Sequence, residues 1–245
     1  MKNSVSFNSD LSKFGIGLFE TIRVDKKPID LDLHMNRMFN SKDELNMNFK
    51  YSKEFLKNEV LKYIDINNIE NKALRLTVFD EGYNISIRDI PYNNFTYEKG
   101  FKLIISPIKR GNSIIYKHKT TNYYENIYVK RYANERGFDD GLFIDTYGNI
   151  LECSMSNIFF IKGNCVYTPS SKLPILNGIM KKRIFSICRE ISIPLIEKNI
   201  NISEILDYDF VFISNSLMNV MKVTQIEDTF YNSSNVLFDK ILSYI

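Results

Sequence analysis

Segments of strand character and segments of helix character alternate along the whole chain of 245 residues, and this alternation most limits the folds open to it. Residues rich in β-branched and aromatic types predict strands at 14–24, 73–79, 101–108 and 209–215. Glycine-containing turns predict hairpins at 141–152 and 157–169. Helical spacing of apolar residues and a helix start after Gly178 predict helices at 30–48, 53–66, 119–136, 178–191 and 234–244. The polar stretch between Gly82 and Pro91 is predicted to be irregular. This order of elements indicates an α+β or α/β fold.

The length fits one large domain or two modest ones. Gly111 and Asn112 interrupt the pattern of elements, and they place the boundary near 108–118. We therefore predict a small N-terminal α/β domain over 1–110 and a larger C-terminal α/β domain over 117–245.

Composition excludes several classes of function. Lys and Arg total 32 against 29 Asp and Glu, so a net charge of +3 is weak evidence for nucleic-acid binding. No apolar run is long enough to span a bilayer, and the first residues have no apolar signal core, so we expect a cytoplasmic protein without a membrane partner. Three Cys and two His make a disulfide framework or a metal site improbable.

Two residues are candidates for covalent and acid–base chemistry. Lys119 follows Lys117 and His118, and cationic neighbours lower the pKa of an amine, which suits a Schiff-base lysine. Glu152 ends a predicted strand and is a candidate to hold a pyridinium nitrogen protonated. Taken singly, neither residue is specific, because most lysines are solvated and an acidic residue at the end of a strand most often lies on the surface.

Three further positions are candidates for binding a phosphate. Arg37 is a possible phosphate clamp, although an exposed helical arginine is the ordinary alternative. Gly178-Ile179-Met180 lies at a predicted helix start, where backbone N–H groups bind anions or simply begin the helix. Ser216 either donates its hydroxyl to the same phosphate or only ends a strand.

Together these stretches resemble the fold-type IV, or class IV, pyridoxal-phosphate enzymes. That family includes branched-chain aminotransferases, D-amino-acid aminotransferases and 4-amino-4-deoxychorismate lyases. The resemblance covers about 14–226 and is carried by FGIGLFETIR, HMNRM, KTTNYYEN, GLFIDTYGNILECSMSNIFFI, VYTP, LNGIMKKR and FVFISNSLMNVMKV. It implies a two-domain α+β fold-type IV enzyme of the D-amino-acid aminotransferase type.

The resemblance implies roles for individual residues. Lys119 corresponds to the lysine that binds the cofactor covalently and later moves protons, and Glu152 to the acid paired with the pyridine nitrogen. Arg37, Ile179, Met180 and Ser216 correspond to the phosphate site, and Tyr123 to a tyrosine that in some members contacts the phenolic oxygen of the cofactor.

Some positions depart from the family pattern. Many transaminases have Gly-Ile-Thr where this chain has Gly178-Ile179-Met180, so one side-chain donor is missing. The Asn-Gly-Ile-Met form and the stretch SNSLMNVM are similar to the aminodeoxychorismate lyases, with Asn219 in place of their proline. Tyr123 is similar to several transaminases instead. The N-terminal hairpin of the family is much reduced.

The resemblance thus implies a lyase that converts 4-amino-4-deoxychorismate to 4-aminobenzoate and pyruvate, a step of folate biosynthesis. The alternative is a class IV aminotransferase that acts on branched-chain or D-amino acids with 2-oxoglutarate, and a non-catalytic cofactor-binding protein is a third possibility. Thr21, Arg75 and Arg88 are the candidate contacts to the substrate. The family also implies a homodimer.

Overall fold

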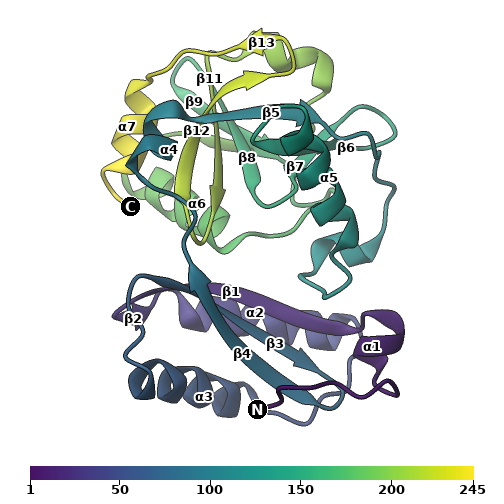
Figure 1. Ribbon diagram of the computed structural model, residues 1–245. Helices are drawn as coiled ribbons and strands as arrows, with labels where there is room; N and C mark the ends of the chain where they lie inside the picture. The colour runs from purple at the N-terminus through teal and green to yellow at the C-terminus, as the bar shows by residue number, and fades with distance from the viewer. The chain divides into compact units, whose positions relative to one another are not determined.

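The computed structural model describes residues 1–245 and divides them into two compact units (Figure 1). Unit 1 consists of residues 1–91 and 118–123, and unit 2 consists of residues 92–117 and 124–245. Each unit packs helices against a β-sheet, which agrees with the predicted α+β class. No helix of the chain has both the length and the apolar character that crossing a membrane requires.

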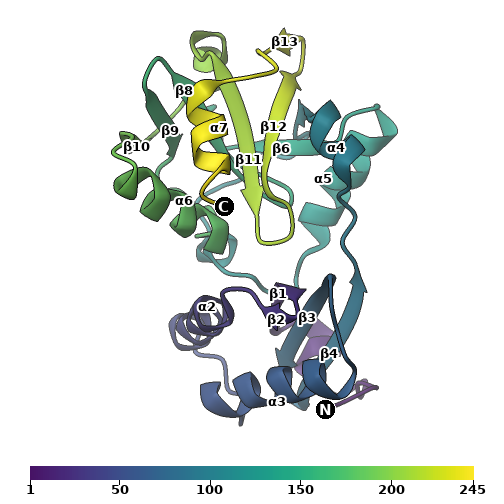
Figure 2. The same cartoon turned by 90° about the vertical axis from the view of Figure 1, so that its left-hand side faces the viewer.

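Unit 1 is a four-stranded antiparallel sheet whose one face is covered by two helices (Figure 2). The strand order is β2-β1-β3-β4. The elements are α1 (Asp10–Phe14), β1 (Gly17–Asp25), β2 (Lys27–Pro28), α2 (Leu31–Glu44), α3 (Lys53–Ile66), β3 (Lys72–Phe79) and β4 (Gly82–Asp89). Alternate residues of the strands, among them Ile22 and Leu74, pack against Met35 of α2 and Val60 of α3. Because side chains alternate along a strand, the intervening residues lie on the face opposite the helices.

Two predicted segments of this region are wrong. Residues 82–89 form β4 instead of an irregular stretch, because they pair with β3 along their whole length whatever the polarity of their outward side chains. The helix predicted at 119–136 begins only at Tyr124. Residues 118–123 instead run beside β1, where Thr120 pairs with Leu18.

Unit 2 is built on a larger mixed sheet with the order β10-β9-β8-β11-β12-β5-β6-β7 and with β13 beside β12. The strands are β5 (Phe101–Ile105), β6 (Asp140–Ile144), β7 (Ile150–Cys153), β8 (Asn157–Lys162), β9 (Cys165–Pro169), β10 (Leu195–Lys198), β11 (Phe210–Asn215), β12 (Asn219–Ile226) and β13 (Thr229–Phe230). The helices are α4 (Asn94–Lys99), η1 (Ile114–Lys117), α5 (Tyr124–Glu135), α6 (Ile179–Glu190), η2 (Ile202–Asp207) and α7 (Val236–Leu242). Both predicted hairpins are present, as β6–β7 and β8–β9.

Three apolar clusters pack against the sheet of unit 2, and the two larger ones lie on its opposite faces. On one face, the helices α6 and α7 pack Ile184 and Phe238 against Phe159 and Phe212 of the sheet. The rings of Phe159 and Phe212 are stacked, with centroids 4.8 Å apart. The core on the other face includes Ile158 and Phe160, which alternate along β8 with Phe159 and Ile161 of the first core. Strands that are buried on both faces give a rigid base for the residues at their ends.

The boundaries of the two units differ from the predicted domains 1–110 and 117–245. Residues 92–110 belong to unit 2, because β5 pairs with β12 and β6. Residues 118–123 belong to unit 1, because they pair with β1. Both differences arise from strand pairing between residues far apart in sequence, which composition along the chain does not reveal.

Candidate active site

Lys119 lies in an extended segment that is pinned to the first strand of unit 1. Phe19 N–H donates to the Lys119 carbonyl oxygen at 3.0 Å, and Thr121 N–H donates to the Gly17 carbonyl oxygen at 2.9 Å. A Cβ at Gly17 would lie 3.0 Å from the Thr121 hydroxyl oxygen, so this approach favours glycine. The pairing places Lys119 Nζ 4.3 Å from the centre of the Phe19 ring and 4.9 Å from that of Tyr123.

His118 anchors the lysine segment to helix α2. Its buried ring lies with Nδ1 2.9 Å from the Ser41 hydroxyl and Nε2 3.5 Å from the Glu44 carboxylate. The edge of the Phe19 ring meets Tyr123 at a centroid distance of 5.1 Å. The neighbouring histidine therefore anchors the segment, while the Lys119 amine lies next to the rings of Phe19 and Tyr123.

Three arginines share the face of the unit 1 sheet that points away from the helices. Thr21 pairs with Arg75, and Arg23 and Arg88 both pair with Ala73, one from each neighbouring strand. The Arg75 guanidinium lies 3.7 Å from the centre of the same Phe19 ring that contacts Lys119. Burial first, and then the positive charge of Arg88, lower the pKa of Arg75. The predicted substrate contacts Thr21, Arg75 and Arg88 thus lie on one face, and the register adds Arg23 to them.

The opposite face of this sheet holds a buried charge cluster that contains Arg37. Glu20 accepts hydrogen bonds from Arg37 Nε at 2.8 Å and from Arg37 Nη2 at 2.5 Å, and its Oε2 lies 2.6 Å from His34 Nδ1. Burial alone would raise the pKa of Glu20, but the charges of Arg37 and His34 and their hydrogen bonds outweigh it and lower this pKa to about 2. Burial lowers the pKa of His34, although the neighbouring Glu20 carboxylate and its hydrogen bond act in the opposite direction.

We expect Glu20→Gln to destabilise the protein by about 3–5 kcal/mol at pH 7, because it leaves the Arg37 charge buried without its carboxylate. A carboxylate whose pKa is lowered on folding stabilises the native state above its unfolded pKa. That stabilisation is lost as the pH falls from the usual 4.5 towards about 2. Urea unfolding at pH 7 and pH 3 should therefore show a smaller difference between wild type and variant at the lower pH. The free energy of unfolding of the exposed control Glu98→Gln should stay within about 0.5 kcal/mol of wild type. A change as small as this in Glu20→Gln would contradict the expectation.

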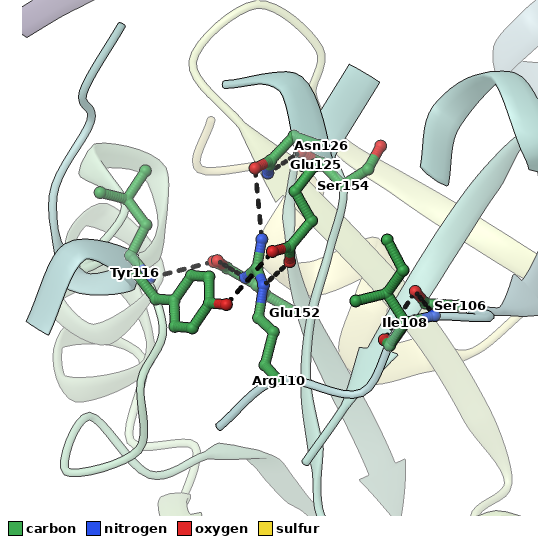
Figure 3. Close-up of polar contacts among 9 residues, drawn as sticks. Ser106, Ile108, Arg110, Tyr116, Glu125, Asn126, Glu152 and Ser154 are labelled. Carbon is green, nitrogen blue, oxygen red and sulfur yellow. Dashed lines mark hydrogen bonds and ion pairs between the residues drawn. The ribbon is translucent and has the colours of Figure 1, made fainter. Parts of the chain in front are cut away.

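Glu152 lies at the end of β7 in unit 2 and is bound by a buried arginine (Figure 3). Arg110 Nη1 donates to Glu152 Oε1 at 2.9 Å. Glu152 Oε2 accepts from the Leu176 N–H at 3.1 Å and lies 3.4 Å from Asn157 Nδ2. All three donors stabilise the ionised carboxylate. Asn157 Nδ2 also donates to the Leu176 carbonyl oxygen at 2.9 Å, so this side chain lies between Glu152 and the segment at Leu176.

Helix α6 begins at the predicted phosphate site without a side-chain cap. Its N-cap residue is Gly178, which has no side chain. The N-cap therefore offers no side-chain acceptor to the first-turn N–H groups of Ile179 and Met180. A Cβ at Gly178 would fall 2.0 Å from Asn157 Oδ1, so a larger residue there would require the Asn157 side chain to move. On the neighbouring strand Ser214 lies opposite Asn157, and its buried hydroxyl has no hydrogen-bond partner.

Ser216 lies nearby in the tight turn between β11 and β12. The Asn215 side chain accepts the N–H groups of Leu217 and Met218, both at 2.9 Å. Asn219 has a φ of 58°, a conformation that the proline of the related motif cannot adopt. An uncapped helix start beside an unsatisfied hydroxyl fits a phosphate, because anions bind both the N–H groups and the positive end of the helix dipole.

Sequence reasoning missed three of these residues. Arg23 is two positions from Thr21 on β1, and strand alternation would have placed the two on one face. Ser214 precedes Ser216 in the motif already singled out. Arg110 had no local signal, because nothing near it in the sequence marks a buried arginine, and its partner Glu152 follows 42 residues later.

A sequence model of the class IV aminotransferases matches residues 17–226. This chain belongs to the class IV aminotransferase family. The aminodeoxychorismate lyase of Bacillus subtilis is 26% identical over 239 residues, which cover 91% of this chain and 81% of that protein. The branched-chain-amino-acid aminotransferase of Pseudomonas aeruginosa is 25% identical over 87% of this chain and 77% of its own length.

Solved structures give the same assignment of family. A Legionella pneumophila protein, provisionally assigned as a 4-amino-4-deoxychorismate lyase, matches with a TM-score of 0.90 at 26% identity, over 100% of this chain and 95% of its own. The predicted fold-type IV architecture is thereby confirmed. Class IV aminotransferases and their lyase relatives are pyridoxal-phosphate-dependent enzymes, so this member is an enzyme that uses that cofactor.

Proposed function

We propose that this class IV enzyme is a lyase that converts 4-amino-4-deoxychorismate to 4-aminobenzoate and pyruvate, a step of folate biosynthesis. The observation that carries the proposal is the arginine face of unit 1. Arg23, Arg75 and Arg88 lie together there, and Arg75 shares the Phe19 ring with Lys119. The proposed substrate bears two carboxylates, which guanidinium groups bind well. The relatives with lyase names support the same reaction.

The residues proposed to hold the cofactor are those that the family resemblance indicates. In unit 2, Ile179 and Met180 offer backbone N–H groups to the phosphate and Ser216 offers its hydroxyl, while Glu152 accepts a hydrogen bond from the pyridine nitrogen. In unit 1, Arg37 is proposed for the phosphate and Tyr123 for the phenolic oxygen, and Lys119 for the covalent bond. When bound, pyridoxal phosphate supplies an aldehyde that condenses with amines and a pyridinium ring that accepts electrons.

Lys119 carries the proton transfers in this proposal. Its Nζ, once released by the amine of the substrate, removes the proton from the carbon that bears the nitrogen. The same Nζ then delivers a proton to the departing enolpyruvyl group. Loss of pyruvate makes the ring aromatic, so the reaction proceeds without an amino acceptor.

The second candidate is an aminotransferase that acts on branched-chain or D-amino acids with 2-oxoglutarate. Tyr123 favours it, because several transaminases have tyrosine there, and relatives named branched-chain-amino-acid and D-alanine aminotransferases match at 25% and 26% identity. Lys119 and Glu152 serve both reactions equally. What separates the reactions is the need for a keto acid.

The deciding experiment supplies 4-amino-4-deoxychorismate to the purified holoenzyme with no keto acid present. We expect stoichiometric 4-aminobenzoate and pyruvate. The parallel reaction offers branched-chain and D-amino acids with 2-oxoglutarate and measures glutamate. Turnover only in the second reaction would replace the lyase with the aminotransferase.

We further propose that the enzyme is a homodimer that uses an apolar surface formed by η1 and α5. Ile114 and Ile115 of η1 are exposed, as are Tyr124, Ile127 and Tyr128 of α5. Their spacing puts the three α5 residues on one side of the helix. The two elements are linked, since the Tyr116 hydroxyl donates to Glu125 at 3.2 Å. An apolar surface of this kind marks a protein interface.

We expect Ile127→Glu to convert the dimer to a monomer, because a buried charge without a partner is strongly unfavourable in an interface. Sedimentation velocity at micromolar protein measures the mass. The matched control is Leu206→Glu, which changes an exposed leucine on η2 in the same unit and should leave the dimer intact. A wild-type protein that sediments as a monomer would refute the proposal.

A further inference from the structure

Arg110 is among the largest fully buried side chains of the protein, and its guanidinium group contacts residues of four elements of unit 2, which are η1, α5, β6 and β7 (Figure 3). Nε donates to Glu125 Oε1 at 2.7 Å, Nη1 to Glu152 Oε1 at 2.9 Å, and Nη2 to Asn126 Oδ1 at 3.3 Å. The Phe143 ring centre lies 3.5 Å from the Arg110 Cζ atom, and that of Tyr116 lies 4.5 Å from it. A guanidinium held by this many partners is fixed in one orientation.

The surroundings of Arg110 are rigid as well. Its backbone N–H donates to the Ile144 carbonyl oxygen at the end of β6 at 3.0 Å. Asn126 Nδ2 donates to the Ser154 carbonyl oxygen at 2.7 Å, which ties the start of α5 to the chain just after Glu152. The bound carboxylate of Glu152 therefore cannot turn without breaking several hydrogen bonds.

Other charged groups lie near this pair. Glu125 is the second carboxylate on Arg110, and the Tyr116 hydroxyl also contacts it. From α6, the positive charge of Lys181 also attracts Glu152, although Lys181 Nζ itself lies 2.9 Å from Glu197. Arg110 donates directly to the Glu152 carboxylate, while the Lys181 amine is paired with another carboxylate.

We propose that Arg110 is a positioning residue that keeps Glu152 ionised, so that the proton it shares with the pyridine nitrogen stays on the nitrogen. The inference rests on the proposed role of Glu152 as the partner of that nitrogen. In a buried site a carboxylate without a cation takes up a proton readily. Without Arg110, Glu152 would draw the proton from the ring nitrogen, and the ring would lose its capacity to accept electrons.

The variants for the test separate a change of charge from a loss of folding. Arg110→Gln alone leaves Glu125 and Glu152 without their cation and is expected to weaken folding. The double variant Arg110→Gln with Glu125→Gln removes one of these two negative charges. Its matched control is Glu125→Gln, which keeps Arg110 on Glu152. Arg136→Gln changes an exposed arginine of the same unit and serves as the second control.

The measurement is the ¹⁵N chemical shift of the pyridine nitrogen in holoenzyme that carries ¹⁵N-labelled pyridoxal phosphate. We expect a protonated nitrogen in wild type, in Glu125→Gln and in Arg136→Gln, and an unprotonated one in the double variant. The kcat of the double variant should fall by at least about ten-fold relative to Glu125→Gln, the change that one unit of pKa represents, with KM little changed. Replacing Arg110 by Lys instead of Gln should retain part of the ¹⁵N shift of the protonated nitrogen and part of the kcat. A lysine keeps the positive charge but lacks the planar fork of donors.

Equal ¹⁵N shifts in the double variant and in Glu125→Gln would overturn the inference. So would a protonated nitrogen in a double variant whose kcat has fallen, since Arg110 would then act on the fold alone. Failure of the proposed function is recognised separately. In that case turnover would require a keto acid, while the expected ¹⁵N shifts would be unchanged, because Glu152 serves both reactions equally.

Discussion

Lys119→Ala is expected to lower turnover by about 10²–10⁴-fold or more, the range for removal of a general acid–base group, and to abolish covalent attachment of the cofactor. The proposed reaction gives Lys119 Nζ both the covalent bond and the proton transfers, and no other lysine contacts Phe19 and Tyr123 as it does. The measurements are kcat with the lyase substrate and mass spectrometry of the peptide that contains residue 119 after borohydride reduction. Wild type should carry the added cofactor on that peptide, and the variant should carry none.

The fold should survive this substitution. The Lys119 carbonyl oxygen, and not its side chain, accepts the hydrogen bond from Phe19, so the segment keeps its pairing with β1. The matched control is Lys117→Ala, an exposed lysine two residues earlier, which should retain wild-type turnover and labelling. Turnover in Lys119→Ala at the level of this control would rule out the proposed role of the lysine.

Glu152→Gln is expected to lower kcat strongly, by about 10²-fold or more if the carboxylate is what keeps the ring nitrogen protonated. An amide of the same size keeps the side chain in place but carries no charge. The cofactor should still bind, because the phosphate site and Lys119 are unchanged. Absorbance of the reduced and unreduced protein measures cofactor content, and a stopped-flow assay measures the rate.

The same variant should destabilise the protein less than the full 3–5 kcal/mol that follows loss of one partner from a buried ion pair. Arg110 keeps its hydrogen bond to Glu125, so its charge is not left alone. The control Glu125→Gln removes the other carboxylate and should retain most of the turnover. A Glu152→Gln enzyme as active as that control would refute the electron-sink role of Glu152.

Local patterns predicted much of the fold because the forces that they report are local. The hairpin at 157–169 has a glycine turn between strands that pair with each other, and the helix that starts after Gly178 follows a glycine where a Cβ would collide with the Asn157 side chain. The strand β4 escaped prediction because its stability comes from pairing with β3 and from one buried face, which Tyr83 and Ile85 supply. Residues 119–123 were predicted as helix for the same reason, since the pairing of this segment with β1 is nonlocal.

The order and spacing of the motifs in the sequence were sufficient to predict the family, the fold and the cofactor, and comparison with known proteins confirmed all three. They also singled out Lys119, Glu152 and the start of α6 as candidates, because each lies inside a contiguous motif. Only the tertiary structure decided that Arg23, Arg75 and Arg88 share one face, and that Arg110 binds Glu152. Strand register and the pairing of buried charges depend on residues far apart in the chain, and such contacts exist only once the sheets and helices have packed together.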